Sequence, residues 1–255
     1  MSRLDPRLLL QGYAAGIFPM ADSREASELF WVEPRSRAVI PLDKFHLARS
    51  LRRTIRSGYF SVTMDRDFPA VISACADREE TWINADIERA MLALHASGNA
   101  HSIEAWHEGE LVGGLYGVKL GRAFFGESMF SRATDASKVA LAWLVARLKA
   151  GGYTLLDCQF MTSHLVSLGA VSISRKAYVA LLSGALGGGG VGADGVGSVA
   201  GAPLSDGAAS VATEGSVRSA SPDLRALDRL LEATGASGSA AAEGYVIAQL
   251  LGQTS

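Results

Sequence analysis

Residues 110–129 read ELVGGLYGVKLGRAFFGESM, and this stretch predicts two strands joined by a tight turn. The turn is Leu120-Gly121-Arg122, which separates a strand at residues 110–119 from one at residues 123–129. A third strand is expected just before them, at residues 102–106. Three strands with such short connections indicate antiparallel neighbours in one sheet.

A helix and a buried strand continue this pattern. The helix starts at Thr134 or Asp135 and runs to Ala150, and the strand covers residues 153–160. The helical period brings four apolar side chains to one face: Leu141, Leu144, Val145 and Leu148. Three strands, a helix, a strand and a helix in this order predict an α+β domain with a mixed sheet. One fold with this order is the acetyltransferase-like fold, in which strands splay apart to form an acyl-transfer cleft.

The rest of the chain suggests a small N-terminal domain (residues 1–59), the sheet domain (60–182) and a C-terminal tail (183–255). Further helices are expected at residues 5–16, 43–57, 68–77, 85–97, 164–169 and 174–182. Residues 184–220 are almost all Gly, Ala, Ser and Val without any aromatic residue, which predicts a flexible linker. Leucines in residues 221–234 predict a small helix, and the apolar residues 244–251 are expected to dock on the main body.

Composition excludes several classes of protein. The 255 residues carry a net charge of −2, yet the first 60 residues carry ten bases and six acids, a local charge of +4. The two cysteines, Cys75 and Cys158, lie in apolar surroundings, which argues against a disulfide framework and fits a reducing compartment. Neither a signal pattern nor an apolar run of about 18 residues is present. We therefore expect a cytoplasmic protein without a membrane partner.

Two carboxylates stand in apolar runs where a strand meets a loop. Glu127 has aromatic neighbours on both sides, which would raise its pKa and direct it into a pocket. A second interpretation is an edge-strand carboxylate bonded to backbone amides or to Arg132. Asp157 and Gln159 are two residues apart on a strand, so they face the same side, opposite Leu156 and Cys158. A turn or helix-capping role for Asp157 remains the alternative.

Four arginines share one face of the predicted helix at residues 43–57: Arg49, Arg52, Arg53 and Arg56. No acidic residue lies between Asp43 and Asp65 to neutralise them. The row is typical of contact with a nucleic-acid backbone, and a solvated surface is the alternative. Aromatic residues that could stack on a base, or belong to the core, are Trp31, Trp82, Trp106 and Phe124. The five histidines show no metal-ligand spacing, and no phosphate loop or nucleophile motif is present.

Ordered motifs over residues 8 to about 180 carry a family resemblance. They are GYAAGIFP (12–19), RAVIP (37–41), FHLARS (45–50), REETWI (78–83), AHSIE (100–104), LVGGLYG (111–117), GESMFSR (126–132), ASK (136–138), DCQ (157–159) and SLGA (167–170). With these motifs the chain resembles the bacterial leucyl/phenylalanyl-tRNA–protein transferases. It departs from them after Leu182, where their aromatic- and proline-bearing C-terminal strand is replaced by the glycine-rich segment.

The resemblance implies the reaction and the partners. Such enzymes move Leu or Phe, and we expect Met, from leucyl-tRNA or phenylalanyl-tRNA to the N-terminal amine of proteins that begin with Arg or Lys. The product is an N-degron for proteolysis. The aminoacyl ester is already activated, so we expect neither a cofactor nor a metal, and we expect a monomer.

The resemblance also implies site residues. The catalytic positions are Glu127, Asp157 and Gln159. The aminoacyl pocket maps to Leu115, Met129, Leu141, Leu148 and Leu156, and the terminal adenosine to Trp82 and Phe124. The arginine row would bind the tRNA. Asp157 with Gln159 would attract the acceptor ammonium and assist the loss of its proton, and Glu127 would hold its geometry.

Two other functions compete with this one. An acyl-CoA-dependent N-acetyltransferase would need a glycine-rich turn at the start of the helix after Met129, and residues 131–138 contain no glycine. A non-catalytic RNA-binding module would leave Glu127 and Asp157 without a role.

Overall fold

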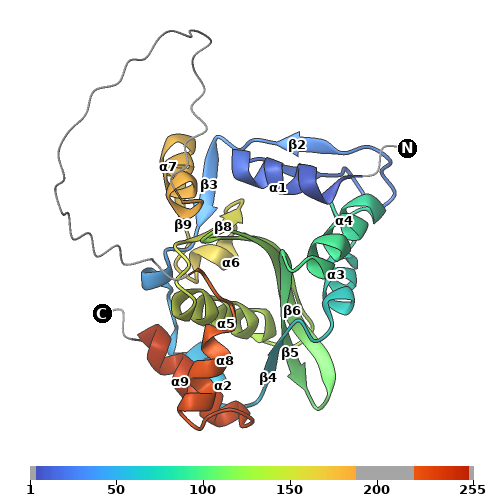
Figure 1. The fold of residues 1–255 in the computed structure, drawn as a ribbon. Helices are drawn as coiled ribbons and strands as arrows, with labels where there is room; N and C mark the ends of the chain where they lie inside the picture. The colour runs from blue at the N-terminus through green and yellow to red at the C-terminus, as the bar shows by residue number, and fades with distance from the viewer. Residues whose placement is uncertain (1–3, 188–220, 253–255) are drawn as a thin grey trace, which may run out of the picture.

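The predicted strands β6 (Glu110–Leu120) and β7 (Ala123–Ser131) lie at the centre of a mixed sheet in the computed structural model. The structure describes residues 4–187 and 221–252, and in these ranges the sheet has seven strands in the order β4-β5-β6-β7-β8-β3-β9 (Figure 1). The other five strands are β3 (Ser36–Val39), β4 (Ser61–Met64), β5 (Ala100–His107), β8 (Leu155–Gln159) and β9 (Val171–Ser174). All neighbours are antiparallel except β7 and β8, which confirms the predicted α+β class with a mixed sheet.

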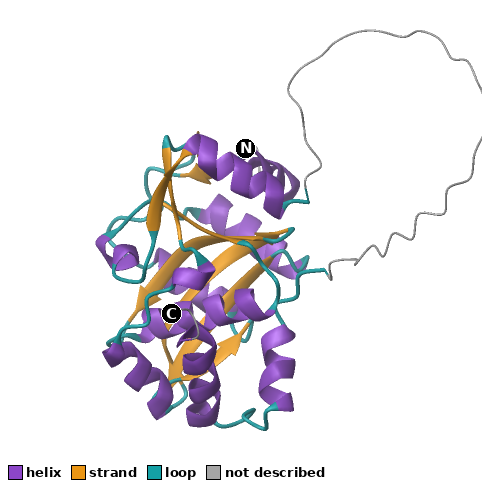
Figure 2. Ribbon diagram, turned by 90° about the vertical axis from the view of Figure 1, so that its left-hand side faces the viewer, coloured by secondary structure: helices purple, strands orange, loops and turns teal. Residues whose placement is uncertain are grey.

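Helices cover both faces of this sheet (Figures 1 and 2). One face packs on α5 (Ala136–Ala150), with α2 (Arg49–Ser57), α8 (Ala226–Ala233) and α9 (Ala240–Gly252) around it. The other packs on α3 (Phe68–Ala76) and α4 (Ala85–Ala96), with α1 (Pro6–Ala15) and α7 (Arg175–Ala185) beside them. Two apolar cores result, and the adjacent Phe124 and Phe125 of β7 each enter a different one.

Shorter elements complete the described chain. The strands β1 (Phe18–Met20) and β2 (Phe30–Val32) form a separate two-stranded sheet, and α6 (Ser163–Val166) follows β8. The predicted helix at residues 43–57 is instead a 3-10 turn, Leu42–Lys44, followed by α2. It is interrupted because Phe45 enters the core and the backbone N–H of His46 donates to the carbonyl of Leu168 at 3.0 Å. No helix in the described ranges is long and apolar enough to cross a bilayer.

The N-terminal residues are part of the main body. β3 lies between β8 and β9 in the sheet, and α2 packs against α5. The expected boundary at residue 59 therefore falls between two segments, α2 and β4, that both pack on the same core.

The C-terminal helices are also built into the core. The small helix expected at residues 221–234 and the docking of residues 244–251 are both confirmed by α8 and α9, so this part of residues 183–255 is not a tail. Most of the expected linker, residues 188–220, lies outside the described residues. The buried Arg147 of α5 pairs with Asp228 of α8 at 2.6 Å and donates to the carbonyl of Leu224 at 3.1 Å. Together with the apolar contacts, this ion pair ties α8 to α5.

Shortening a buried leucine of α8 tests this docking. Leu227 is fully buried, whereas Leu230, one turn away, is 36% exposed. We expect Leu227→Ala to lower the free energy of unfolding by about 2–5 kcal/mol, because it leaves a cavity against α5. Leu230→Ala, the control, should cost less than about 1 kcal/mol. Urea unfolding of the two variants measures the difference, and equal losses would show that α8 does not contribute to the core.

Candidate active site

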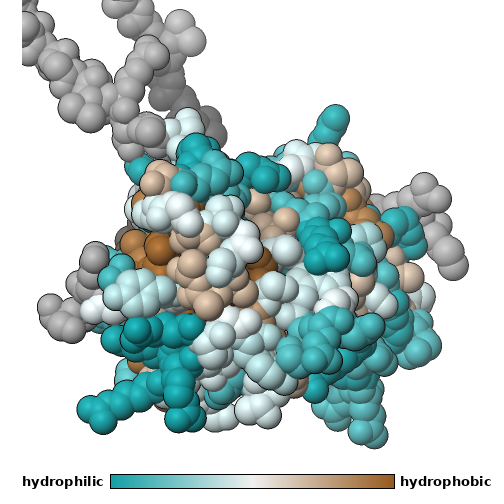
Figure 3. All heavy atoms as spheres, turned by 90° about the horizontal axis from the view of Figure 1, so that it is seen from below, coloured by the Kyte–Doolittle hydropathy of each residue, from teal (hydrophilic) through white to brown (hydrophobic). Residues whose placement is uncertain are grey.

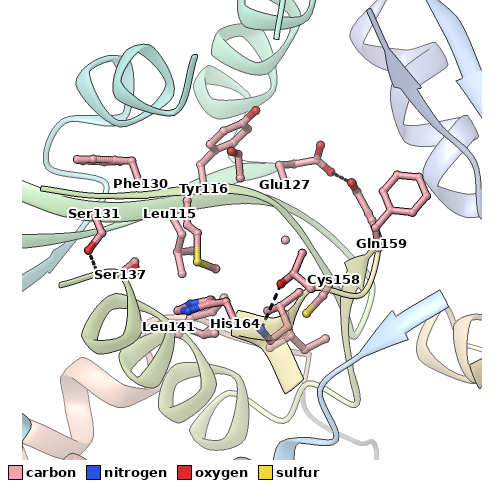
Figure 4. Close-up of a pocket in the computed structure, with 18 of the residues that line it drawn as sticks. Leu115, Tyr116, Glu127, Phe130, Ser131, Ser137, Leu141, Cys158, Gln159 and His164 are labelled. Carbon is pink, nitrogen blue, oxygen red and sulfur yellow. Dashed lines mark hydrogen bonds between the residues drawn. The ribbon is translucent and has the colours of Figure 1, made fainter. Parts of the chain in front are cut away.

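A cavity of about 460 Å³ opens where β7 and β8 separate (Figure 4). The two strands pair in parallel only from Ala123 to Phe125 and from Leu155 to Asp157. Beyond this point each strand lines one side of the cavity, β7 with residues 126–131 and the end of β8 with Cys158 and Gln159, followed by Phe160. Side chains of α5 and α6 line the remaining sides of the cavity. The pocket therefore arises where two strands that lie about 30 residues apart in the sequence diverge.

Glu127 lines this cavity at a β-bulge of β7. Gly117 of β6 pairs with Gly126, but Tyr116 pairs with Ser128, so Glu127 is an extra residue without a partner in the ladder. The bulge reverses the alternation of β7: Phe124 faces α5 and Phe125 faces α3 before it, whereas Met129 faces α5 and Phe130 faces α3 after it.

The carboxylate of Glu127 is buried and only half satisfied. Its Oε1 accepts hydrogen bonds from the Tyr13 hydroxyl and from Nε2 of Gln159, both at 2.8 Å. Its Oε2 is buried and has no hydrogen-bond partner among the described residues. Burial raises the pKa of Glu127 to about 7, although the hydrogen bonds from Tyr13 and Gln159 lower it. A carboxylate with this pKa and a free oxygen can exchange a proton with a bound group near neutral pH.

Asp157 lies behind the pocket rather than in its lining. Its carboxylate receives three contacts from Arg37 of β3, from Nε at 2.9 and 3.0 Å and from Nη2 at 2.7 Å. The Tyr178 hydroxyl donates to its Oδ2 at 2.8 Å. Asp157 is fully buried, and the Arg37 guanidinium is held between the rings of Phe18 and Tyr178, 4.7 and 4.6 Å from their centroids. This network joins β8, β3 and α7 and leaves Asp157 no free oxygen toward the cavity.

Gln159 connects the two carboxylates. Its backbone N–H donates to Oδ1 of Asp157 at 2.8 Å, and its side chain reaches Glu127. As the alternation predicts, Gln159 and Asp157 lie on the side of α1 and α7, opposite Leu156 and Cys158. Gln159 has a φ of +61°, a left-handed conformation that is uncommon for a residue other than glycine. This strained end of β8 aims the amide at Glu127.

The apolar wall contains four of the five predicted residues: Leu115, Met129, Leu141 and Leu156. Leu148 is buried in the same core but does not line the cavity. Leu144 and Leu165 line it instead, and Leu144 could have been found because it shares the helix face of Leu141.

Of the two residues predicted to contact the terminal adenosine, one lies at the cavity and the other lies in the core. Trp82 lines the cavity and is half-buried. Phe124 is fully buried on the α5 face and does not line the cavity, so its ring has no free face for a base.

Among the polar residues of the cavity that carried no role in the sequence interpretation, Arg78 and His164 bear ionisable side chains. Arg78 is exposed and donates from Nη2 to the carbonyl of Met129 at 2.8 Å. His164 follows the strand end, and its Nε2 is buried without a hydrogen-bond partner in the described residues. Arg78 lies in the quoted motif REETWI, and His164 lies between the motifs DCQ and SLGA, so position near these motifs was the available signal.

The four arginines of α2 are all exposed and line a separate groove. Within the described ranges, none of them forms an ion pair with a carboxylate. The same ranges hold no group of three His, Cys, Asp or Glu side chains that could bind a metal ion.

The fold and the site together define an α+β protein in which a largely apolar cavity lies beside a buried carboxylate with a raised pKa, an arrangement typical of an enzyme active site. Comparisons with known proteins identify the family. The family model for the leucyl/phenylalanyl-tRNA protein transferase matches residues 39–183, and the model for the N-terminal domain of the same enzyme matches residues 2–35. The chain therefore belongs to the leucyl/phenylalanyl-tRNA–protein transferase family, and it is an aminoacyltransferase.

Relatives with this name are similar over most of their length. The protein of Rhizorhabdus wittichii is 63% identical over 191 residues, which cover 73% of this chain and 77% of the relative. That of Zymomonas mobilis is 60% identical over 187 residues, with 72% and 70% covered. That of Cereibacter sphaeroides strain KD131 is 61% identical over 186 residues, with 72% and 86% covered.

Proposed function

We propose that this chain transfers Leu or Phe, and also Met, from aminoacyl-tRNA to the N-terminal amine of proteins that begin with Arg or Lys. The product would be an N-degron for proteolysis in the cytoplasm. The observation that carries the proposal is the free Oε2 of Glu127, buried at a largely apolar cavity. The name of the relatives supports the donor class, because they are called leucyl/phenylalanyl-tRNA–protein transferases.

Glu127 is proposed as the general base. The acceptor α-amine has a pKa near 8, so it reacts in its neutral form, and its nitrogen loses one further proton as it attacks the ester carbonyl. Oε2 of Glu127 accepts that proton, and the bond from the carbonyl carbon to the ribose oxygen breaks. The proton then passes to the ribose oxygen, so Glu127 is regenerated. The ester is already activated, so the reaction calls for no cofactor.

This proposal exchanges the roles that the sequence predicted for Asp157 and Glu127. Asp157 was expected to assist proton loss, but its oxygens are occupied by Arg37, Tyr178 and the backbone of Gln159. Asp157 is therefore a positioning residue, which holds Gln159 so that its amide supports Glu127.

The cavity accounts for the proposed donors and acceptors. Its apolar wall fits unbranched side chains, and β-branched Ile or Val should be disfavoured by only about 1–3 kcal/mol. Ionised Glu127 and Asp157, against one buried Arg37, leave a negative charge at the site, which favours a cationic N-terminal residue. The divergence of β7 from β8 supports an acetyltransferase-like cleft that holds an aminoacyl ester.

The tRNA is proposed to reach the site along α2. Trp82 at the cavity is suited to stack on the terminal adenosine, whereas Phe124 is too deeply buried to do so. The arginine row on α2 presents four exposed charges to the acceptor stem.

The transfer itself is tested with radiolabelled Leu-tRNA and a peptide that begins with Arg. We expect label in this peptide and none in the same peptide with an acetylated N-terminus, because only a free amine can attack. Acetyl-CoA is offered in a parallel reaction. Acetylation of the peptide without any transfer from Leu-tRNA would overturn the proposal in favour of an N-acetyltransferase.

Charge reversal on α2 tests the tRNA path. Replacing the four arginines by glutamate should weaken tRNA binding by at least about tenfold and reduce the slope of log Kd against log salt by about 3, since about four phosphate contacts are lost. The control reverses Arg7 and Arg89, which are exposed on α1 and α4 at the opposite face. Filter binding at several salt concentrations measures the Kd and the salt slope of both variants. Equal effects of the α2 substitutions and of the control would show that the arginine row is a solvated surface and not a tRNA-binding site.

A further inference from the structure

We propose that α9 forms part of the tRNA-binding surface, and that a groove between α2 and α9 holds a phosphate of the RNA backbone. The inference rests on the proposed function, because it takes tRNA as the ligand. It concerns helices beyond residue 183, where the match to the family model ends. Figure 3 shows the underside of Figure 1, the side on which α2, α8 and α9 lie, where strongly hydrophilic residues border apolar ones.

The position of α9 is set by two backbone contacts with α2. A Cβ added to Gly244 would lie 2.0 Å from the carbonyl oxygen of Ile55, and one added to Gly58 would lie 2.7 Å from the nitrogen of Ala241. Side chains larger than hydrogen cannot be placed at either contact without moving a helix. On the inner face of α9, Ile247 and Leu251 are buried in the core shared with α5. The outer edge of α9 is thereby held beside the arginine row.

This arrangement forms a groove of about 400 Å³ lined by Arg52, Arg56, Tyr245, Ala248, Gln249 and Gly252. The Arg56 guanidinium lies over the Tyr245 ring, 4.8 Å from its centroid. Such stacking fixes the plane of a guanidinium and leaves its N–H groups available to an anion. Tyr245 and Gln249 are four residues apart and both exposed, so they form one polar edge of α9.

Among the residues that the structure describes, no carboxylate lines the groove to compensate its positive charge. The one carboxylate of α9, Glu243, accepts from the backbone N–H of Gly238 at 2.9 Å and does not line the groove. Arg52 and Arg56 also line the neighbouring groove with Arg49 and Arg53, so the positive surface is continuous across α2. A continuous row of cations with an amide donor at its edge fits a polyanionic backbone such as RNA.

The test places a carboxylate in the groove of the full-length protein. Gln249→Glu should raise the Kd for uncharged tRNA by about five- to tenfold near 0.1 M salt and lower the salt slope by about 1, because it neutralises an arginine. Ala233→Glu, exposed on α8 and outside the groove, is the charge-matched control and should change Kd by less than about twofold.

The ring of Tyr245 provides a second readout. Tyr245→Ala should weaken tRNA binding about threefold through the loss of the stack, whereas Tyr245→Phe should keep the wild-type Kd. In the transfer assay KM for tRNA should rise without a change of kcat. Equal Kd values for Gln249→Glu and Ala233→Glu, in a protein whose wild type binds tRNA, would overturn the role of α9 alone. A wild type that does not bind tRNA would overturn the proposed function with it.

Discussion

Replacing Glu127 by glutamine is expected to slow aminoacyl transfer by about 10²- to 10⁴-fold. The amide has nearly the same shape but cannot accept the proton of the attacking amine. Binding of tRNA should be unchanged, since Glu127 lies at the cavity and not in the grooves along α2. Single-turnover transfer from Leu-tRNA to the Arg peptide measures the rate, and filter binding measures the Kd. A loss of less than about threefold would exclude Glu127 as the base.

The pH dependence distinguishes a base from a structural role. The wild-type rate should fall as the pH decreases through about 7, where Glu127 becomes protonated. Tyr13→Phe is the matched control. The Tyr13 hydroxyl lowers the pKa of Glu127 by hydrogen bonding, so its removal should move this limb of the profile to higher pH. A limb that stays in place would show that the titrating group is not Glu127.

The stability of Glu127→Gln gives the complementary control. The pKa of Glu127 is raised from 4.5 to about 7 by folding, so its ionisation opposes folding. The variant should therefore be more stable than the wild type by about 3 kcal/mol above pH 7. This difference should decrease between pH 7 and 4.5 and vanish below 4.5. A variant that transfers slowly but unfolds at higher denaturant concentration has lost chemistry and not structure.

Replacing Asp157 by alanine is expected to lower the free energy of unfolding by about 3–5 kcal/mol, because the change leaves Arg37 charged and buried without its partner. Denaturant unfolding at pH 7 measures the loss. The matched control is Asp86→Ala, which breaks the partly exposed surface pair of Asp86 with Arg89 and should cost less than about 1 kcal/mol.

A double variant distinguishes a structural role of the Arg37–Asp157 ion pair from a role of Asp157 in the reaction. Arg37→Met combined with Asp157→Leu removes both charges and should recover part of the stability that the single variant loses. If Asp157→Ala instead abolished transfer while the protein kept its full stability, Asp157 would act in proton transfer, as the sequence alone suggested.

The regular elements around the site could be predicted from local patterns. The strands on both sides of Gly121, the helix α5 and the buried strand β8 appear where the sequence pattern places them, although α5 is buried on nearly every side and not on one face alone. Leucine spacing also predicted α8, and an apolar run predicted the docking of α9. β9 was not predicted, because its four residues form an edge strand with three exposed side chains and show no apolar alternation.

The partners of the two carboxylates could not be predicted in this way. Tyr13 and Glu127 are 114 residues apart, and Arg37 and Asp157 are 120 residues apart. No periodicity relates such positions; they meet because β3 pairs with β8 and α1 packs on the opposite face from α5. The bulge at Glu127 was equally hidden, since the string FFGESMF does not show which residue leaves the ladder.

By itself the sequence determined the class of fold, the family motifs and the identity of the polar residues at the site, because these depend on local pattern and residue type. Only the tertiary structure decided which carboxylate is free to act. Burial and hydrogen bonding set the charge state of an acid, and both depend on neighbours brought together by folding. Arg37 and Tyr178 bind the carboxylate of Asp157, whereas Glu127, which lines the cavity, keeps one buried oxygen without a hydrogen-bond partner in the described residues. Tertiary packing likewise placed the C-terminal helix α9 beside the arginines of α2, where the sequence had indicated only an apolar patch.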